Sequence, residues 1–119
     1  MKVQRGDVVF VDFPFSDRAG SKVRPALVVQ CDANNRKLDD TIVVAITSRK
    51  RFAATEPTQL LVEVATPAGK QTGLLYDSAV QCENIVTIDH SFIIRRIGSF
   101  DASLMQMIEA CLKAALDLS

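Results

Sequence analysis

Apolar and polar residues along this chain follow patterns typical of short β-strands. The stretch at 41–47 is β-branched and nearly all apolar, which predicts a central strand buried on both faces. In the stretch at 80–88 the alternation changes phase near Glu83 and Asn84, which predicts a bulge or bend. The other predicted strands are 7–13, 24–30, 60–64 and 92–97, with a short extended segment at 73–76.

One helix is predicted, at the C-terminal end of the chain. Asp101 is a favourable N-cap, and the helical pattern continues to about residue 116. Its apolar stripe, which we expect to contact the core or a second copy of the chain, is formed by Leu104, Met105, Ile108, Leu112, Ala115 and Leu116. The polar segments at 14–23, 32–40 and 66–69 are predicted to be turns or loops.

Strands at short spacing followed by one terminal helix predict a mainly β fold with a C-terminal α-helix, in the α+β class. The sheet is expected to be antiparallel and strongly bent or barrel-like. A chain of 119 residues, 48% hydrophobic and 24% charged, predicts a single globular domain over residues 1–119. No apolar run approaches the roughly 20 residues of a membrane span, and no secretory signal is visible. We therefore expect a cytoplasmic protein without a membrane partner.

The net charge is zero, but the charges are unevenly divided. Residues 1–51 contain ten Lys and Arg against six Asp, whereas residues 52–119 contain four Lys and Arg against eight acidic residues. This division predicts a localised positive surface that could attract nucleic acid, although segments of an ordinary protein can differ by as much.

Cysteine and histidine are too sparse to indicate a metal site. Cys31, Cys82 and Cys111 are widely spaced without a C-x-x-C motif, which predicts reduced thiols rather than disulfides or zinc ligands. His90 is the single histidine, so neither a histidine cluster nor a catalytic histidine pair can form within one chain. We expect no metal and no cofactor.

Two polar residues at strand ends are the candidates for chemistry. Arg24 lies where a glycine-containing loop enters a buried strand, and Thr47 ends the most apolar strand. A guanidinium and a hydroxyl together suit a phosphate group and its developing negative charge. The alternative is an arginine held by an acidic neighbour and a threonine present for its β-propensity.

The chain resembles the MazF/PemK (Kid) family of toxins. The resemblance is carried by Arg5-Gly6-Asp7-Val8 and by Arg24-Pro25-Ala26-Leu27-Val28-Val29, followed by Val44-Ala45-Ile46-Thr47-Ser48. It continues through Gly73-Leu74, Asp77-Ser78, residues 85–89 and Ile97-Gly98, so it covers essentially the whole chain in order.

This resemblance implies an SH3-like barrel of the MazF/PemK/CcdB type and the toxin of a type II toxin–antitoxin system. It implies a homodimer that cleaves single-stranded RNA sequence-selectively, inhibited by a cognate antitoxin with an acidic or amphipathic tail. Arg24 and Thr47 then bind the scissile phosphate, and Arg24 also assists proton transfer or stabilises the transition state. The implied reaction is metal-independent attack by the 2′-OH, giving 2′,3′-cyclic phosphate and 5′-OH ends.

Five further residues are candidates for RNA-backbone contact: Lys22, Ser48, Arg49, Lys50 and Arg51. The alternative for such a cluster is a solvated loop. The chain has no Trp, one Tyr and six Phe, and Phe15 and Phe52 are the loop aromatics expected to stack on bases unless they are buried.

The chain departs from the family pattern at Ala19. Several family members carry a glutamate at this place, five residues before the arginine, so that any role of this carboxylate is vacant or has moved here. Two other functions stay open: a CcdB-like toxin that binds DNA gyrase without catalysis, and an inactive SH3-like interaction module. Among these, the Arg24 and Thr47 pair favours the nuclease.

Overall fold

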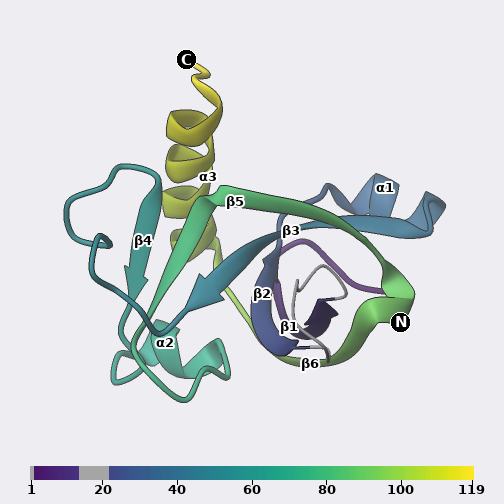
Figure 1. Ribbon diagram of the computed structural model, residues 1–119, viewed down its shortest axis with the longest axis horizontal. Helices are drawn as coiled ribbons and strands as arrows, with labels where there is room; N and C mark the ends of the chain where they lie inside the picture. Colours follow the sequence, from purple (N-terminus) through teal and green to yellow (C-terminus); the bar gives the residue numbers. More distant parts are fainter. Residues whose placement is uncertain (1, 14–21) are drawn as a thin grey trace.

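A computed structural model describes residues 2–13 and 22–119 of the chain. Within these residues six strands form one antiparallel sheet in the order β4-β5-β3-β2-β1-β6 (Figure 1). The strands are β1 (Asp7–Phe13), β2 (Lys22–Val28), β3 (Asp40–Thr47), β4 (Gln59–Val62), β5 (Ser78–Asp89) and β6 (Ile93–Ser99). The helices are α1 (Asp32–Lys37), α2 (Pro67–Gln71) and α3 (Ala102–Leu116), and the 3-10 turn η1 (His90–Phe92) joins β5 to β6. The predicted mainly β fold with a C-terminal helix is confirmed.

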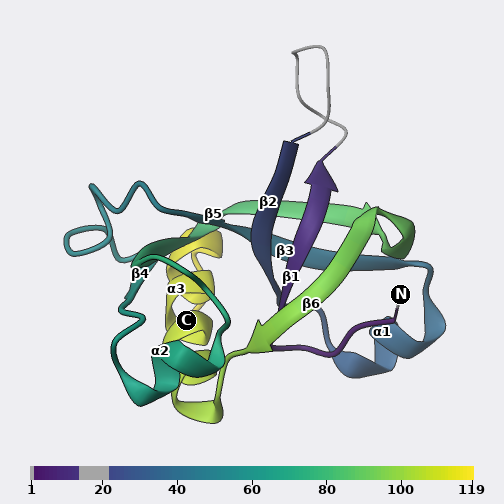
Figure 2. The same ribbon diagram turned by 90° about the horizontal axis from the view of Figure 1, so that it is seen from below.

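The sheet is strongly bent, and its two edges, β4 and β6, do not pair with each other. Strands β1, β2 and β6 curl beneath β3 and β5, as Figures 1 and 2 show together. β5 extends across both halves of the molecule, pairing with β4 near its start and with β3 along most of its length. Bending lets one sheet enclose apolar side chains on both of its faces.

The bend of β5 coincides with the predicted bulge. Val44 pairs with Ile85 but the next residue, Ala45, pairs with Gln81, so that 82–84 have no partner on β3. The Cys82 backbone N–H instead donates to the Thr58 carbonyl oxygen (3.0 Å). Extra residues on one strand increase its local twist and bend, so the phase change in the sequence correctly predicted this irregularity.

Two apolar clusters lie on opposite faces of the central strands. One face carries Val8, Leu27, Val44 and Ile46, which pack with α3 and with the start of β5. The other face carries Val9, Val11, Ala26, Val28 and Val43, enclosed by the curled half of the sheet. Because successive strand residues point to opposite faces, β3 is buried on both, which confirms the prediction for 41–47.

Helix α3 begins as predicted, with the Asp101 carboxylate accepting a hydrogen bond from the Leu104 N–H (2.8 Å). Met105, Ile108 and Cys111 are buried, and Leu104, Leu112 and Ala115 pack against the same cluster. Leu116 is 53% exposed, so it does not contact the core, and its contact with a second copy of the chain stays a prediction. Leu116 ends the helix, immediately before Asp117 takes the left-handed conformation (φ 55°).

Four local predictions were wrong. Residues 32–40 are not only turns, because they include α1, and 67–69 belong to α2, with Thr66 as its N-cap. Residues 73–76 form a turn rather than an extended segment. Strand β2 covers Lys22–Val28 rather than the predicted 24–30, so Pro25 lies well within it, although only β1 pairs with β2 at this position. A proline there interrupts no second ladder.

The short helix α1 is needed to place a buried amide. Asn35 is 1% exposed, and its Nδ2 donates to the Gln30 carbonyl oxygen (3.0 Å). Its Oδ1 accepts from Gln30 Nε2 (2.9 Å) and Thr41 Oγ1 (2.7 Å). Polar groups away from water need such partners, and this network joins α1 to the start of β3.

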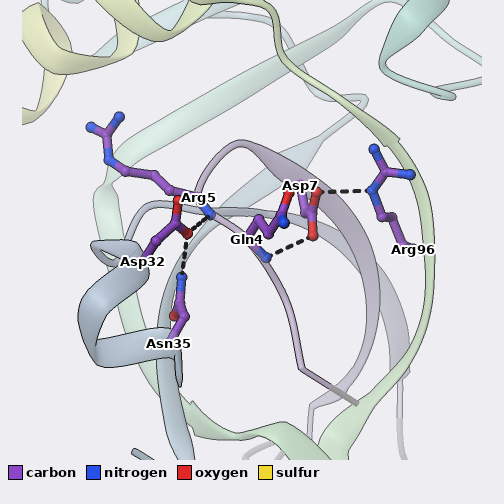
Figure 3. Close-up of polar contacts among 6 residues, drawn as sticks. All are labelled: Gln4, Arg5, Asp7, Asp32, Asn35 and Arg96. Carbon is purple, nitrogen blue, oxygen red and sulfur yellow. Dashed lines mark hydrogen bonds and ion pairs between the residues drawn. The ribbon is translucent and has the colours of Figure 1, made fainter. Parts of the chain in front are cut away.

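The Arg5-Gly6-Asp7 segment fastens the N-terminal end to the rest of the domain (Figure 3). The Asp7 carboxylate accepts from Arg96 Nε and from the Gln4 N–H, both at 2.8 Å. The Arg5 N–H donates to Asp32 Oδ1 (2.7 Å), and this hydrogen bond is the largest cause of a lowered pKa at Asp32. These contacts give the motif a role in the fold.

All three cysteines are free thiols, as predicted. Cys82 on β5 and Cys111 on α3 are buried in the same cluster, whereas Cys31 is exposed. Burial and the neighbouring Cys111 thiol raise the pKa of Cys82 to about 12, which makes it a poor nucleophile. In the described part of the chain, no helix has the length and apolarity that crossing a membrane requires.

We predict that Asn35→Ala lowers the free energy of unfolding by about 3 kcal/mol, because buried groups of Gln30 and Thr41 lose their partner. The measurement is the urea midpoint. Asn34→Ala is the matched control, since the side chain of Asn34 forms no hydrogen bond within the described residues, and it should change stability by less than about 0.5 kcal/mol. Equal effects of the two substitutions would contradict the network.

We also predict that stability falls as the pH decreases from 7 to 5. His90 is buried, neither ring nitrogen has a hydrogen-bond partner in the described residues, and burial followed by the charge of Lys2 lowers its pKa below 6.5. A lowered pKa means that the unfolded state binds the proton more readily than the folded state. The stability contributed by the neutral, buried His90 is therefore complete above about pH 6.5 and declines at lower pH.

Denaturant midpoints measured across this pH range test the assignment. His90→Gln removes the only histidine and should flatten the decline. An unchanged slope in His90→Gln would show that another group is responsible.

Candidate functional site

The site begins where β2 and β3 separate. These strands pair at only three positions, Val28 with Val43, Leu27 with Val44 and Ala26 with Ala45. Two residues further in the same register, Arg24 on β2 would stand opposite Thr47 on β3. The ladder ends before that point, and the strand ends diverge there.

A cleft of about 210 Å³ lies at this divergence. Arg24 and Thr47 both line it, together with Ser48. Its remaining walls come from β1, β2, β3, the turn after α2, β5 and β6, and comprise Phe10, Val23, Pro25, Ile46, Gly73, Leu74, Leu75, Tyr76, Ser78 and Ile97. A small cleft with mostly apolar walls and a few polar groups is typical of a ligand site.

Arg24 brings a permanent positive charge to the cleft. The residue is exposed, and it forms no ion pair with any carboxylate in residues 2–13 or 22–119. The acidic neighbour considered from the sequence is therefore not found in the described part of the chain. A guanidinium carries five N–H donors in a planar fork, which matches the oxygens of a phosphate.

Thr47 is held in a definite orientation. It is half-buried at the end of β3, and its Oγ1 accepts a hydrogen bond from the Arg49 backbone N–H (3.1 Å). A hydroxyl has one donor and two acceptor sites, so the Thr47 O–H remains available to donate to an anion. The backbone after β3 thus orients the hydroxyl without consuming its proton.

A wider groove continues from the cleft. It is lined by Ser48, Lys50, Val64, Leu75, Tyr76 and Asp77, so Ser48, Leu75 and Tyr76 belong to both hollows. Lys50 Nζ lies 3.9 Å from Asp77 Oδ2 across this groove. An ion pair at this distance and exposure is weak, so Lys50 can exchange Asp77 for a stronger anion at little cost.

The turn at 73–77 forms the shared rim and is fastened at both ends. Gly73 has φ +74°, and a Cβ placed on it would collide with the Ile97 carbonyl group of β6. At the other end, Asp77 Oδ1 accepts from the Val64 N–H (2.9 Å), and Ser78 Oγ donates to the Tyr76 carbonyl oxygen (2.7 Å). The backbone is thereby fixed while Leu75 and Tyr76 stay 79% and 69% exposed.

The structure separates the remaining predicted residues from the hollows. Lys22, Arg49 and Arg51 are exposed but line neither the cleft nor the groove. The guanidinium of Arg51 lies over the ring of Phe52, 5.0 Å from its centroid, and Phe52 is 48% exposed rather than buried. Phe15 and Ala19 lie outside the described residues.

Sequence reasoning missed two contributors to the site. Arg95 on β6 pairs with Phe10 of the cleft wall, and its guanidinium lies 5.3 Å from the centroid of that ring. Arg95 lines neither the cleft nor the groove, and only the pairing of β6 with β1 places its charge over the ring of a cleft-wall residue, so no local pattern could reveal it. Tyr76 could have been found, because it is the only tyrosine and follows a turn-forming glycine.

Comparisons with known proteins agree on one family. Residues 4–116 match the family described as the PemK-like, MazF-like toxin of type II toxin–antitoxin systems. Endoribonuclease EndoA of Bacillus subtilis is 34% identical over 119 residues, covering 99% of this chain and 97% of that protein. Endoribonuclease MazF6 of Mycobacterium tuberculosis is 30% identical over 119 residues, covering 99% of this chain and all of that protein.

Solved structures show the same fold. A mycobacterial endoribonuclease in complex with its cognate antitoxin has a TM-score of 0.77 and 25% identity, covering 98% of this chain and 97% of the other. A MazE–MazF structure from Deinococcus radiodurans has a TM-score of 0.75 at 21% identity, with both chains fully covered. The second match supports the fold alone.

We predict that Gly73→Ala costs about 3 kcal/mol of unfolding free energy or more, because it combines an unfavourable positive φ with a backbone collision. Gly6→Ala is the matched control: Gly6 also has a positive φ (+96°), but its added Cβ meets only ordinary contacts, so we expect a loss of about 1–2 kcal/mol. Thermal unfolding of both variants measures the difference. A Gly73→Ala variant as stable as Gly6→Ala would mean that the turn is not fastened to β6.

Proposed function

The chain belongs to the PemK-like, MazF-like toxin family of type II toxin–antitoxin systems, and from this premise we propose that it cleaves single-stranded RNA at a phosphate bound by Arg24 and Thr47. Two relatives named endoribonucleases match this chain along essentially their whole length. The observation that carries the site assignment is that both residues line one cleft, two positions beyond the last pair of the β2–β3 ladder.

The chemistry follows from the groups in the cleft. The ribose 2′-OH gives up its proton as its oxygen attacks the adjacent phosphorus, and the P–O5′ bond breaks as the 5′-oxygen of the next nucleotide takes up a proton. The products are a 2′,3′-cyclic phosphate and a 5′-OH, with no net change in protons. Negative charge builds on the phosphoryl oxygens, where the Arg24 guanidinium and the Thr47 hydroxyl donate hydrogen bonds. DNA lacks the attacking hydroxyl, so the reaction is selective for RNA.

Backbone positions flanking the scissile phosphate have cations and a hydroxyl within reach. Ser48 and Lys50 line the hollows, and Arg49, Arg51 and Lys22 are exposed next in sequence to residues that line them. Arg95, over the ring of Phe10, adds a charge from β6. Such contacts hold the strand in register without reading its sequence.

The same proposal includes partners. We expect a homodimer in the cytoplasm that a cognate antitoxin inhibits through an acidic or amphipathic tail. The complex of the similar mycobacterial endoribonuclease with its antitoxin supports this expectation. A tail with carboxylates would compete with phosphate for the same cations.

We predict that Arg24→Ala lowers RNA cleavage by about 100-fold or more, equivalent to about 2.7 kcal/mol of transition-state stabilisation. Arg24→Lys should recover part of the rate, since the charge returns without the planar fork. Cleavage of a long mixed-sequence RNA, with cut sites mapped and the ends identified, measures the effect.

Three controls make this result specific. Circular dichroism should show that Arg24→Ala folds, because Arg24 is exposed. Excess EDTA should leave wild-type cleavage unchanged, and a 2′-deoxy substitution at a mapped site should abolish cleavage there. Full activity of Arg24→Ala, or loss of wild-type activity on chelation, would refute the proposed mechanism.

A further inference from the structure

Tyr76 is an aromatic side chain that does not pack in the core of the domain. It is 69% exposed, and its neighbour Leu75 is 79% exposed, the two highest values among the large apolar side chains of the described residues. Exposing a large apolar side chain in water is unfavourable, yet the turn that carries it is fastened at Gly73 and Asp77. The turn therefore presents the ring on a fixed support.

The position of the ring relates it to the proposed phosphate site. Tyr76 lines the cleft with Arg24 and Thr47, and it also lines the groove with Lys50. A strand whose phosphate occupies the cleft and whose chain continues along the groove must pass this residue. Cations on both sides of an exposed aromatic ring are the pattern expected of a surface that binds single-stranded nucleic acid.

We propose that Tyr76 is the base-stacking residue of this protein, receiving the nucleobase next to the scissile phosphate on its ring, with Leu75 covering the edge of the same base. The inference rests on the proposed RNA cleavage and adds to it a specific contact with the substrate. Tyr76 is a binding residue that does not touch the reacting atoms. Stacking tolerates any base, so it fixes the position of the nucleotide rather than its identity.

The composition of the chain supplies a direct probe. Tyr76 is the only tyrosine and there is no tryptophan, so all tyrosine emission of the protein comes from this one ring. The ligand is a random-sequence pool of single-stranded RNA methylated at every 2′-oxygen, which removes the attacking hydroxyl and prevents cleavage. We expect titration with this pool to quench the tyrosine emission, and to saturate at the concentration at which the anisotropy of end-labelled pool saturates.

Substitutions separate stacking from apolar contact. Tyr76→Ala should weaken binding of the pool by about 10-fold, in the range measured for one stacked base. Tyr76→Leu keeps an apolar side chain without a π-face and should be nearly as weak, whereas Tyr76→Phe should bind like the wild type. On cleavable RNA, Tyr76→Ala should raise KM while kcat changes by less than about threefold, because the ring does not act on the phosphate.

The outcomes distinguish failure of the stacking role of Tyr76 from failure of the proposed nuclease function. If the wild type binds and cuts RNA but its tyrosine emission is unchanged, or if Tyr76→Ala binds like the wild type, the stacking role is overturned and the nuclease stands. If Tyr76→Leu equals Tyr76→Phe, the contact is apolar and the stacking role is also overturned. If the wild type neither binds nor cuts RNA, the proposed function itself fails, and this inference fails with it. All of these substitutions alter an exposed side chain, and their melting temperatures confirm that the variants are folded.

Discussion

The short ladder between β2 and β3 is the constraint on which the site depends. Three paired positions hold these strands together, and two more positions in the same register would have placed Arg24 opposite Thr47. If the strands stayed paired, the two side chains would be neighbours on a closed sheet with no room for a ligand between them. Because the strands separate, the same register that places the two residues together also opens a space of about 210 Å³.

The separation is maintained by features on both sides of the cleft. β2 continues to pair with β1 as far as Lys22, and β3 continues to pair with β5 as far as Thr47. Each strand therefore keeps one partner after losing the other, and neither end is left without support. The glycine-dependent contact of Gly73 with β6 closes the third side. A site assembled from strands that remain paired on their outer edges rests on regular elements rather than on loops, which favours a defined side-chain geometry.

Much of the fold could be predicted from the sequence, because strand and helix periodicity are local signals. The two-sided burial of β3, the irregularity near Glu83 and the Asp101 cap were all visible as residue patterns. The segment at 32–40 was missed because its helix forms around a buried amide: nothing local shows that Asn35 is buried, and its partners Gln30 and Thr41 lie outside the helix.

The site could be predicted only in part from the sequence, for a similar reason. Arg24 and Thr47 were singled out as ends of buried strands, which is a local property, and a family resemblance supplied their proposed roles. Arg95 and the rim at Leu75 and Tyr76 depend on how distant strands and turns meet, so their relevance emerged only from the arrangement in space. The Arg5-Gly6-Asp7 segment shows the converse, because a motif that identifies the family well serves mainly to fasten the N-terminal end.

The unequal exposure of the three thiols gives the molecule a natural attachment point. Cys82 and Cys111 are enclosed between β5 and α3, whereas Cys31 stands in solvent at the start of α1. In both ribbon views α1 lies at the opposite end of the molecule from α2, next to which the rim of the cleft begins (Figures 1 and 2). A maleimide dye would therefore couple selectively at one remote position without any engineered cysteine, so the native chain can carry one member of an energy-transfer pair whose other member is attached to a binding partner.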